Sequence, residues 1–234
     1  MSKKPESILQ FDDVAWHSRT HLVDTIEHVD LVVGPGDCVM VRQEAASQEA
    51  VLFDLAEGLR RPHDGCVRFL GRDWRRLSAF ESARQRGRIG RVFETMGWVS
   101  NLNVYENIVL SQRHHTARGE DELREETEAL VLRAGFAGIP HCRPHLLRRD
   151  ELRRAQWVRA FLGEPALVLL ERPQQDVKDD GAAVLWELIE ETRARGGAVV
   201  WLGPEAGVRP AGDISGIRRY VIRDARLMHD GEEE

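Results

Sequence analysis

The first third of the chain alternates between apolar and polar residues in a way that predicts short strands joined by turns. Residues 8–16 (ILQFDDVAW) and 27–33 (EHVDLVV) have the two-residue period of strands that are buried on one face. A Pro35–Gly36–Asp37 turn then leads into the apolar run 38–41 (CVMV), which we expect to be a short buried strand. Residues 61–74 indicate a turn, a strand and a second turn.

Helical spacing appears first at residues 48–59, where apolar positions lie three and four apart and the pattern ends at Gly58. After a further strand predicted at 88–93, the segment of about 95–163 changes to helical character. It contains a charged helix predicted at 120–134 and an Arg-rich helix predicted at 150–162. We therefore expect a helical block inserted between strands.

The last third returns to alternating strands and helices. Residues 166–171 (ALVLLE) form a continuous apolar run, which is typical of a central strand covered on both faces. A helix over roughly 180–195 leads to a strand at 198–202, and residues 220–231 are expected to form a terminal hairpin. Strand, helix and strand recurring in this order predict an α/β fold with a mostly parallel sheet and helices on both sides.

Composition narrows the function classes. The chain has 234 residues, 42% of them hydrophobic, which suits one large α/β domain or a core with a small subdomain. A net charge of −6 argues against nucleic acid as the main partner, and the basic runs Arg84–Arg91 and Arg148–Arg159 are expected to be solvated helix surface. Cys38, Cys66 and Cys142 form no disulfide or metal-binding pattern, which favours a reducing cytoplasm.

No apolar segment is long enough to be a signal sequence or a membrane span, so we expect any membrane role to come through a partner. The adjacent pair His114–His115 lacks the supporting Cys or carboxylate spacing of a metal site, and no metal site is predicted.

Five stretches in order resemble the ATP-binding-cassette (ABC) transporter ATPases over about residues 8–231. They are the turn PGD (35–37), AEGLRRPHDGCVRFLGRDW (56–74), RIGRVFE (88–94), SNLNVYENIVL (100–110) and EPALVLLERP (164–173). The resemblance implies a P-loop NTPase-type (RecA-like) fold with an antiparallel β subdomain and an inserted helical subdomain. It implies one nucleotide-binding domain over 7–231, with its core at 7–94 and 164–231 and its helical subdomain at about 95–163. The stretch GWVSNLNVYENIVL looks most like the ATPases of envelope lipid-trafficking transporters.

The same resemblance marks where ATP-binding residues would stand, beginning with the phosphate loop. An active loop reads G-x-x-x-x-G-K-[ST], in which backbone N–H groups and Lys hold phosphates and the hydroxyl holds Mg²⁺. Here the loop falls at 43–51 (QEAASQEAV), with Glu49 at the lysine position and Ala50 at the hydroxyl position. At ~4 Å and an effective dielectric of about 20, a unit charge pair is worth roughly 4 kcal/mol, so exchanging Lys for Glu is expected to remove most ATP affinity.

The second nucleotide motif also departs from the family. Its Mg²⁺-orienting Asp is replaced by Glu171 and its catalytic Glu by Arg172, which cannot act as a base because guanidinium stays protonated. Weak metal coordination by Glu171 is conceivable. Our favoured hypothesis is that Arg172 forms a charge-swapped structural bridge with Glu171 or Glu49.

Four further family positions are altered or ambiguous. The ATP-contacting LSGGQ loop corresponds to Leu147, Arg148, Arg149, Asp150 and Glu151. The switch histidine corresponds to Pro204 and the glutamine that links nucleotide to the membrane partner corresponds to Glu94. Trp16 stands where an aromatic side chain stacks on adenine, although plain packing is the more common role of such a Trp.

The losses cluster at catalytic positions, whereas the core strands and the partner-facing segment look intact. This favours a non-catalytic (pseudo-ATPase) transporter subunit at the cytoplasmic face, with no catalytic residues and no cofactor, ATP and Mg²⁺ being expected only if residual family binding survives. The resemblance implies docking on a transmembrane subunit through the segment 94–110, with Glu94, Trp98, Val104 and Tyr105 as candidates, and a homodimer or a second ABC ATPase chain as partner. One alternative is a soluble interaction module that kept the fold. Another is residual ATP hydrolysis through Glu171 and Trp16.

Overall fold

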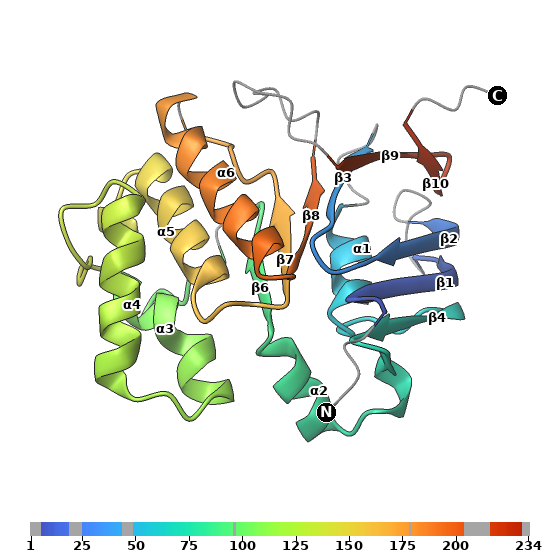
Figure 1. The fold of residues 1–234 in the computed structure, drawn as a ribbon, viewed down its shortest axis with the longest axis horizontal. Helices are drawn as coiled ribbons and strands as arrows, with labels where there is room; N and C mark the ends of the chain where they lie inside the picture. The colour runs from blue at the N-terminus through green and yellow to red at the C-terminus, as the bar shows by residue number, and fades with distance from the viewer. Residues whose placement is uncertain are drawn as a thin grey trace.

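Two β-sheets and a block of helices make up the computed structural model (Figure 1). The structure describes residues 6–18, 25–43, 49–95, 97–177, 179–203 and 216–230. The smaller sheet is antiparallel and has the order β2-β1-β4-β5. Its strands are β1 (Leu9–Trp16), β2 (Ile26–Val33), β4 (Asp64–Phe69) and β5 (Arg72–Asp73).

The larger sheet has the order β10-β9-β3-β8-β7-β6. Its strands are β3 (Cys38–Gln43), β6 (Ile89–Val92), β7 (Leu167–Glu171), β8 (Ala198–Leu202), β9 (Ile217–Arg223) and β10 (Arg226–His229). All neighbours run parallel except the β9–β10 hairpin. This confirms the mostly parallel sheet predicted from the sequence, and the interior position of β7 explains its uninterrupted apolar run.

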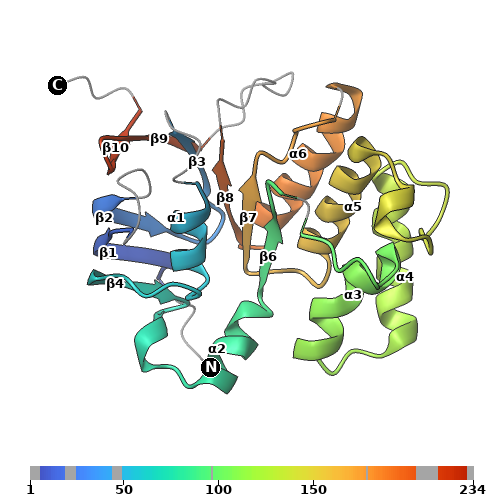
Figure 2. The same ribbon diagram turned by 180° about the vertical axis from the view of Figure 1, so that it is seen from behind.

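The helix α1 (Glu49–Ala56) lies between the two sheets (Figures 1 and 2). Its buried side chains, among them Leu52, Phe53 and Leu55, share one hydrophobic core with residues of β1, β2, β3 and β4. The other face of the larger sheet is covered by α6 (Asp179–Ala194) and α5 (Arg149–Phe161). There Trp186 of α6 stacks on Trp201 of β8, with 5.4 Å between the ring centroids.

The inserted block contains α3 (Val104–His115), α4 (Glu120–Arg133) and α5, which enclose a third core of their own. Helix α3 begins with a capping box, in which the side chain of Asn103 accepts a hydrogen bond from the backbone of Glu106 and Glu106 accepts one in return. Its buried apolar positions, Ile108 and Val109 among them, then face α4 and α5. The segment is helical, as predicted, and α5 also joins it to the larger sheet.

Two connections complete the architecture. A short 3-10 turn (Trp74–Arg76) and helix α2 (Ala79–Arg86) link the antiparallel sheet to β6, and a second 3-10 turn (Pro144–Leu146) precedes α5. Ser78 and Glu81 form a capping box at the start of α2. In the described part of the chain, none of the helices combines the length and apolarity that crossing a membrane requires.

Candidate functional site

The carboxyl end of β7 is where the sequence resemblance locates the second nucleotide motif, and a buried arginine occupies the space beside it. Arg91 lies on the neighbouring strand β6, opposite Leu169 of β7, and is only 8% exposed. Its Nε donates a 3.1 Å hydrogen bond to Oε1 of Glu171, and its Nη2 donates to the same oxygen. Glu171 is itself 4% exposed, so the pair is excluded from water.

The other guanidinium nitrogen of Arg91 binds two carboxylates of the α1 region. Nη1 donates to Glu57 and, at 3.1 Å, to Oδ1 of Asp54. The guanidinium also lies over the Phe93 ring, 4.6 Å from its centroid. One arginine thus joins three acidic side chains, and we call Arg91, Asp54, Glu57 and Glu171 the Arg91 cluster.

Both carboxylate oxygens of Glu171 accept hydrogen bonds from the protein. Oε1 accepts from Arg91, and Oε2 accepts a 2.9 Å hydrogen bond from the backbone N–H of Glu94. A Mg²⁺ ion prefers oxygen ligands that are free to coordinate it and is repelled by a neighbouring guanidinium. The residues at this position therefore do not fit the metal ion of a nucleotide site.

The electrostatics of the Arg91 cluster are those of a buried ion network. Burial lowers the pKa of the Arg91 guanidinium, but the charges of Glu57 and Glu171 outweigh that effect and hold the pKa above its ordinary value. Burial raises the pKa of Glu57, which the adjacent Arg91 only partly opposes. Arg91 consequently stays charged, and the stability of the cluster depends on the ionisation of Glu57.

These positions correct the expectation that the basic runs are solvated helix surface. Arg91 is buried on a strand, and Arg153 of α5 is 1% exposed. Arg153 donates hydrogen bonds of 2.6 Å and 3.0 Å to the carbonyl oxygens of Phe93 and Glu94. Each cation is compensated by acceptors from residues distant in sequence, which the runs themselves do not reveal.

Of the two charge-swapped bridges proposed for Arg172, the one to Glu171 is corrected and the one to Glu49 is not tested. Glu171 pairs with Arg91, and Nε of Arg172 lies 3.4 Å from Oε1 of Glu94. Glu94 is therefore part of an ion pair at the position of the family's linking glutamine. Residues 44–48 and the side chains of Glu49 and Ala50 lie outside the described part of the chain, as does Pro204.

The Trp16 ring is covered by side chains of the same chain. The guanidinium of Arg60 lies 4.8 Å from its centroid, and the His63 ring lies at 6.2 Å in a tilted orientation. The indole therefore packs with a cation and an imidazole.

The loop at the LSGGQ position is built from charged pairs. Helix α5 begins at Arg149, and the backbone N–H of Arg148 donates a 2.8 Å hydrogen bond to Glu151. Asp150 accepts from the side chains of Arg148, at 3.0 Å, and Arg154, at 3.4 Å. Leu147 precedes this charged start and packs at the edge of the helical core.

The structure also separates the residues predicted to dock a partner. Val104 is fully buried and Tyr105 is 7% exposed, with its hydroxyl donating a 2.8 Å hydrogen bond to Glu120. These two residues face the helical core because they open the amphipathic helix α3, so they are not free to contact a partner. Trp98 is half-buried, and the Arg159 guanidinium lies 4.7 Å from its ring centroid.

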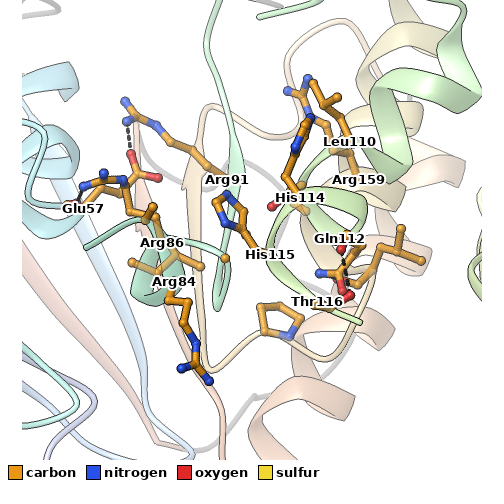
Figure 3. A pocket seen from close by; sticks show the side chains of 18 of the residues that line it. Glu57, Arg84, Arg86, Arg91, Leu110, Gln112, His114, His115, Thr116 and Arg159 are labelled. Carbon is orange, nitrogen blue, oxygen red and sulfur yellow. Dashed lines mark hydrogen bonds and ion pairs between the residues drawn. The ribbon is translucent and has the colours of Figure 1, made fainter. Parts of the chain in front are cut away.

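Next to these residues is a groove that the sequence did not indicate (Figure 3). It lies between α2 and α3 and is floored by β6 and α5. Its lining includes Arg84, Arg86, His114, His115 and Arg159, together with the exposed Phe80 and Val99. The residues come from four separate segments, so no local pattern could have grouped them.

Comparison with known proteins finds sequence relatives that are named ATP-binding proteins of transport systems. The chain is 22% identical over 202 residues to a methionine import ATP-binding protein of Lacticaseibacillus paracasei, covering 86% of this chain and 57% of that protein. It is 23% identical over 209 residues to a macrolide export ATP-binding/permease protein of Chromobacterium violaceum, covering 89% and 32%. The chain thus spans little more than half and about a third of these two relatives. A lipoprotein-releasing system ATP-binding protein of Granulibacter bethesdensis is 28% identical over 179 residues, covering 74% and 76%.

Solved structures show the same fold. A dimeric bacterial ABC transporter cassette superposes with a TM-score of 0.81 at 18% identity, covering 94% of this chain and 96% of that one. A dimeric ATP-binding cassette in a post-hydrolysis state bound to ADP and phosphate gives a TM-score of 0.82, with 97% of each chain covered. No protein-family model matches the chain.

Proposed function

We propose that this chain, a nucleotide-binding domain of the ABC transporter ATPases by its fold and its sequence resemblance, serves as a non-catalytic subunit with a structural or regulatory role. The similar proteins carry ATP-binding in their names, so the proposal concerns how this chain departs from them. It rests on the side chains at the nucleotide site rather than on the fold, because one fold supports many functions.

The observation that carries the proposal is that both carboxylate oxygens of Glu171 already accept hydrogen bonds from the protein. Its carboxylate stands where the family holds Mg²⁺, and both of its oxygens accept hydrogen bonds, one from Arg91 and the other from the backbone of Glu94. The Arg91 guanidinium thereby supplies, from within the protein, the positive charge that a metal ion would bring. Coordination of a metal by Glu171 would first require this buried pair to break, which costs several kcal/mol in typical proteins.

Two neighbouring features support the same conclusion. Arg172 stands at the position of the catalytic base and is engaged with Glu94, so no carboxylate at that position is available to polarise water. The Trp16 ring packs with Arg60 and His63. The loop at 43–51 adds a Glu at the lysine position, which disfavours a polyanion on sequence grounds alone.

The proposed setting is the cytoplasmic face of a membrane, reached through a transmembrane transporter subunit. One relative is named an ATP-binding/permease protein, which unites both parts in one chain, and the similar cassettes are dimeric. We propose that this chain likewise works beside a permease and pairs with a second copy or with another ABC ATPase chain.

The decisive experiment is a calorimetric titration of the purified chain with Mg·ATP up to millimolar concentrations. We expect no binding heat, whereas the methionine import ATP-binding protein of L. paracasei serves as the positive control. A dissociation constant well below a millimolar, or ATP turnover that the Glu171→Ala variant abolishes, would overturn the proposal. Co-purification with a membrane subunit separates the transporter role from that of a soluble interaction module.

A further inference from the structure

The groove between α2 and α3 has the volume and the lining of a small-molecule site. Its volume is about 890 Å³, within the range of about 300–1,000 Å³ that such sites occupy in proteins. Its base is apolar and comes from Ile89 of β6, Leu110 of α3 and Leu162, the C-cap of α5. A base of this kind accepts an apolar ligand body, and the polar groups around it decide which ligand is bound.

The last turns of α2 and α3 close one end of the groove. Gly87 is the C-cap of α2, and a Cβ atom there would lie 2.4 Å from Cβ of His115, the last residue of α3. The two helices therefore touch at this end, and the contact requires a residue without a side chain at position 87. Figure 3 shows Arg84 and Arg86 on the α2 side of His115. The closed end of the groove is thus its basic end.

The lining carries more positive than negative charge. Among the described residues that line the groove, Glu57 is the single carboxylate, and it is bound to Arg91. Arg84 and Arg86 form no ion pair within the described part of the chain, and Arg86 donates only to the carbonyl oxygen of Glu57, at 3.5 Å. The chain as a whole has a net charge of −6, so this end of the groove is a local exception. Its two guanidinium groups are complementary to an anion.

A third arginine adds to this charge from α5. Nη1 of Arg159 donates a 2.9 Å hydrogen bond to the carbonyl oxygen of Gly97, and the guanidinium lies 5.4 Å and 4.7 Å from the ring centroids of Phe93 and Trp98. No carboxylate of the described residues pairs with Arg159, and burial lowers its pKa to about 10. A cation in apolar surroundings without a counter-charge is costly, and an anion in the adjacent groove offsets part of that cost.

His115 supplies a hydrogen-bond donor at the basic end. Burial, and then the charges of His114 and Arg86, lower its pKa below the ordinary 6.5, so the imidazole is neutral at neutral pH and carries one N–H group. A neutral donor beside two guanidinium groups is suited to an oxyanion, which accepts hydrogen bonds from all three.

We propose that the groove binds a small amphipathic organic anion, whose charged head contacts Arg84, Arg86 and His115 and whose apolar body packs on the base. The residues that contact the head lie at the ends of α2 and α3, outside the nucleotide motifs and outside the segment 94–110, so the inference goes beyond the proposed function. An inorganic anion would leave the apolar base uncovered, and a neutral apolar molecule would leave the guanidinium groups without a counter-charge. The site therefore fits a carboxylate or sulfonate on a drug-sized apolar body.

The first test is a fluorescence titration of the purified full chain with anilinonaphthalene sulfonate (ANS), an anion whose emission rises in apolar surroundings. Phenylnaphthylamine has the same rings without the sulfonate and serves as the neutral probe. We expect dodecanoate to displace ANS, and dodecylammonium, which has the same chain length and the opposite charge, to displace it roughly tenfold less well. Millimolar Mg·ATP should leave ANS bound.

Substitutions in the groove test the head and the body separately. Arg84→Gln with Arg86→Gln should weaken ANS binding roughly tenfold and leave the neutral probe within about twofold, because only the anion loses charge-assisted hydrogen bonds. Ala83→Phe, at a half-buried position of α2 that lines the groove, should weaken both probes by filling the space. Arg226→Gln, an exposed change on the distant strand β10, is the matched control and should alter neither. Thermal unfolding checks that each variant folds.

Several results would overturn the inference: no ANS binding, unchanged ANS affinity in the double variant, or equal displacement by dodecanoate and dodecylammonium. Displacement of ANS by Mg·ATP in the wild type and the double variant alike would also overturn it, since the probe would then lie at the nucleotide motifs. The failure of the proposed function is a separate result. ATP binding measured while ANS stays in the groove would overturn the non-catalytic role alone.

Discussion

Arg91 of β6 and Glu171 of β7 form a buried pair, in which Nε of the arginine donates a 3.1 Å hydrogen bond to Oε1 of the glutamate. Their strands are adjacent and parallel, so two residues 80 positions apart meet at the carboxyl edge of the sheet. This edge is where ligands bind in open α/β folds. In this chain the edge is occupied by an internal ion network.

Arg91→Met is expected to destabilise the chain by about 3–5 kcal/mol at neutral pH, because it leaves Glu57 and Glu171 buried without a counter-charge. Urea unfolding followed by circular dichroism measures the change. The control is Arg84→Met, an exposed arginine, which should stay within about 0.5 kcal/mol of wild type. A loss of less than about 1 kcal/mol for Arg91→Met would show that the network contributes little.

The pH dependence of stability should respond to Glu57. Burial raises its pKa above the ordinary 4.5, so its contribution to stability is complete below the unfolded pKa and is lost as pH rises through the folded pKa. Glu57→Gln removes this decline, and the stability of the variant relative to wild type should therefore increase as pH rises from about 4.5. Urea unfolding at several pH values between 4 and 8 measures the difference.

Glu81 provides the opposite slope as a control. Hydrogen bonds from Ser78 and Arg72 lower its pKa from 4.5 to about 2, so its contribution is present above 4.5 and is lost as pH falls towards 2. The stability that Glu81→Gln loses relative to wild type at neutral pH should accordingly disappear as pH falls from 4.5 towards 2. If the stability of Glu57→Gln and of Glu81→Gln relative to wild type changed with pH in the same direction, both pKa directions would be contradicted.

The Glu94–Arg172 pair should be weakly coupled. Its side chains are 36% and 27% exposed and their closest atoms are 3.4 Å apart, so a double-mutant cycle is expected to give about 0.2–1 kcal/mol. Exchanging the charges, with Glu94→Arg and Arg172→Glu together, should be tolerated better than either change alone. A coupling energy above about 2 kcal/mol would mean that this pair, like the Arg91 cluster, is shielded from solvent.

Gly90→Ala is expected to cost at least about 3 kcal/mol or to prevent folding, because the added Cβ atom would lie 1.7 Å from the backbone oxygen of Ala160. Both elements would have to move apart, since neither contact atom belongs to a flexible side chain. Gly138→Ala is the control, as a Cβ atom there meets no atom within 4 Å. In urea unfolding, the free energy of unfolding of Gly90→Ala should therefore be lower than that of Gly138→Ala by most of this loss.

Much of the architecture follows from local sequence. The apolar run of residues 166–171 predicted a covered central strand, and the observed β7 lies between β6 and β8 with every residue buried. The charged and Arg-rich helices of the inserted block were also expected close to their observed bounds. Helix α2 was anticipated only as a basic helix surface at 84–91, and its start was missed, although the Ser78–Glu81 capping box was a usable signal.

The candidate site was predictable only in part. Glu171 and Arg172 could be located from the order of motifs, but their partners, Arg91 and Glu94, could not. Val104 and Tyr105 were expected at a docking surface and are buried instead, because α3 turns these two residues towards the helical core.

The sequence by itself determined most of the elements and their order, since periodicity and residue type are local properties. Only the tertiary structure decided which charges meet. Asp54, Glu57, Arg91 and Glu171 come from three separate segments, and the arginines and histidines that line the groove come from four. Whether a charged side chain is buried and paired or solvated depends on neighbours brought together by packing, and in a low-dielectric interior that difference amounts to several kcal/mol.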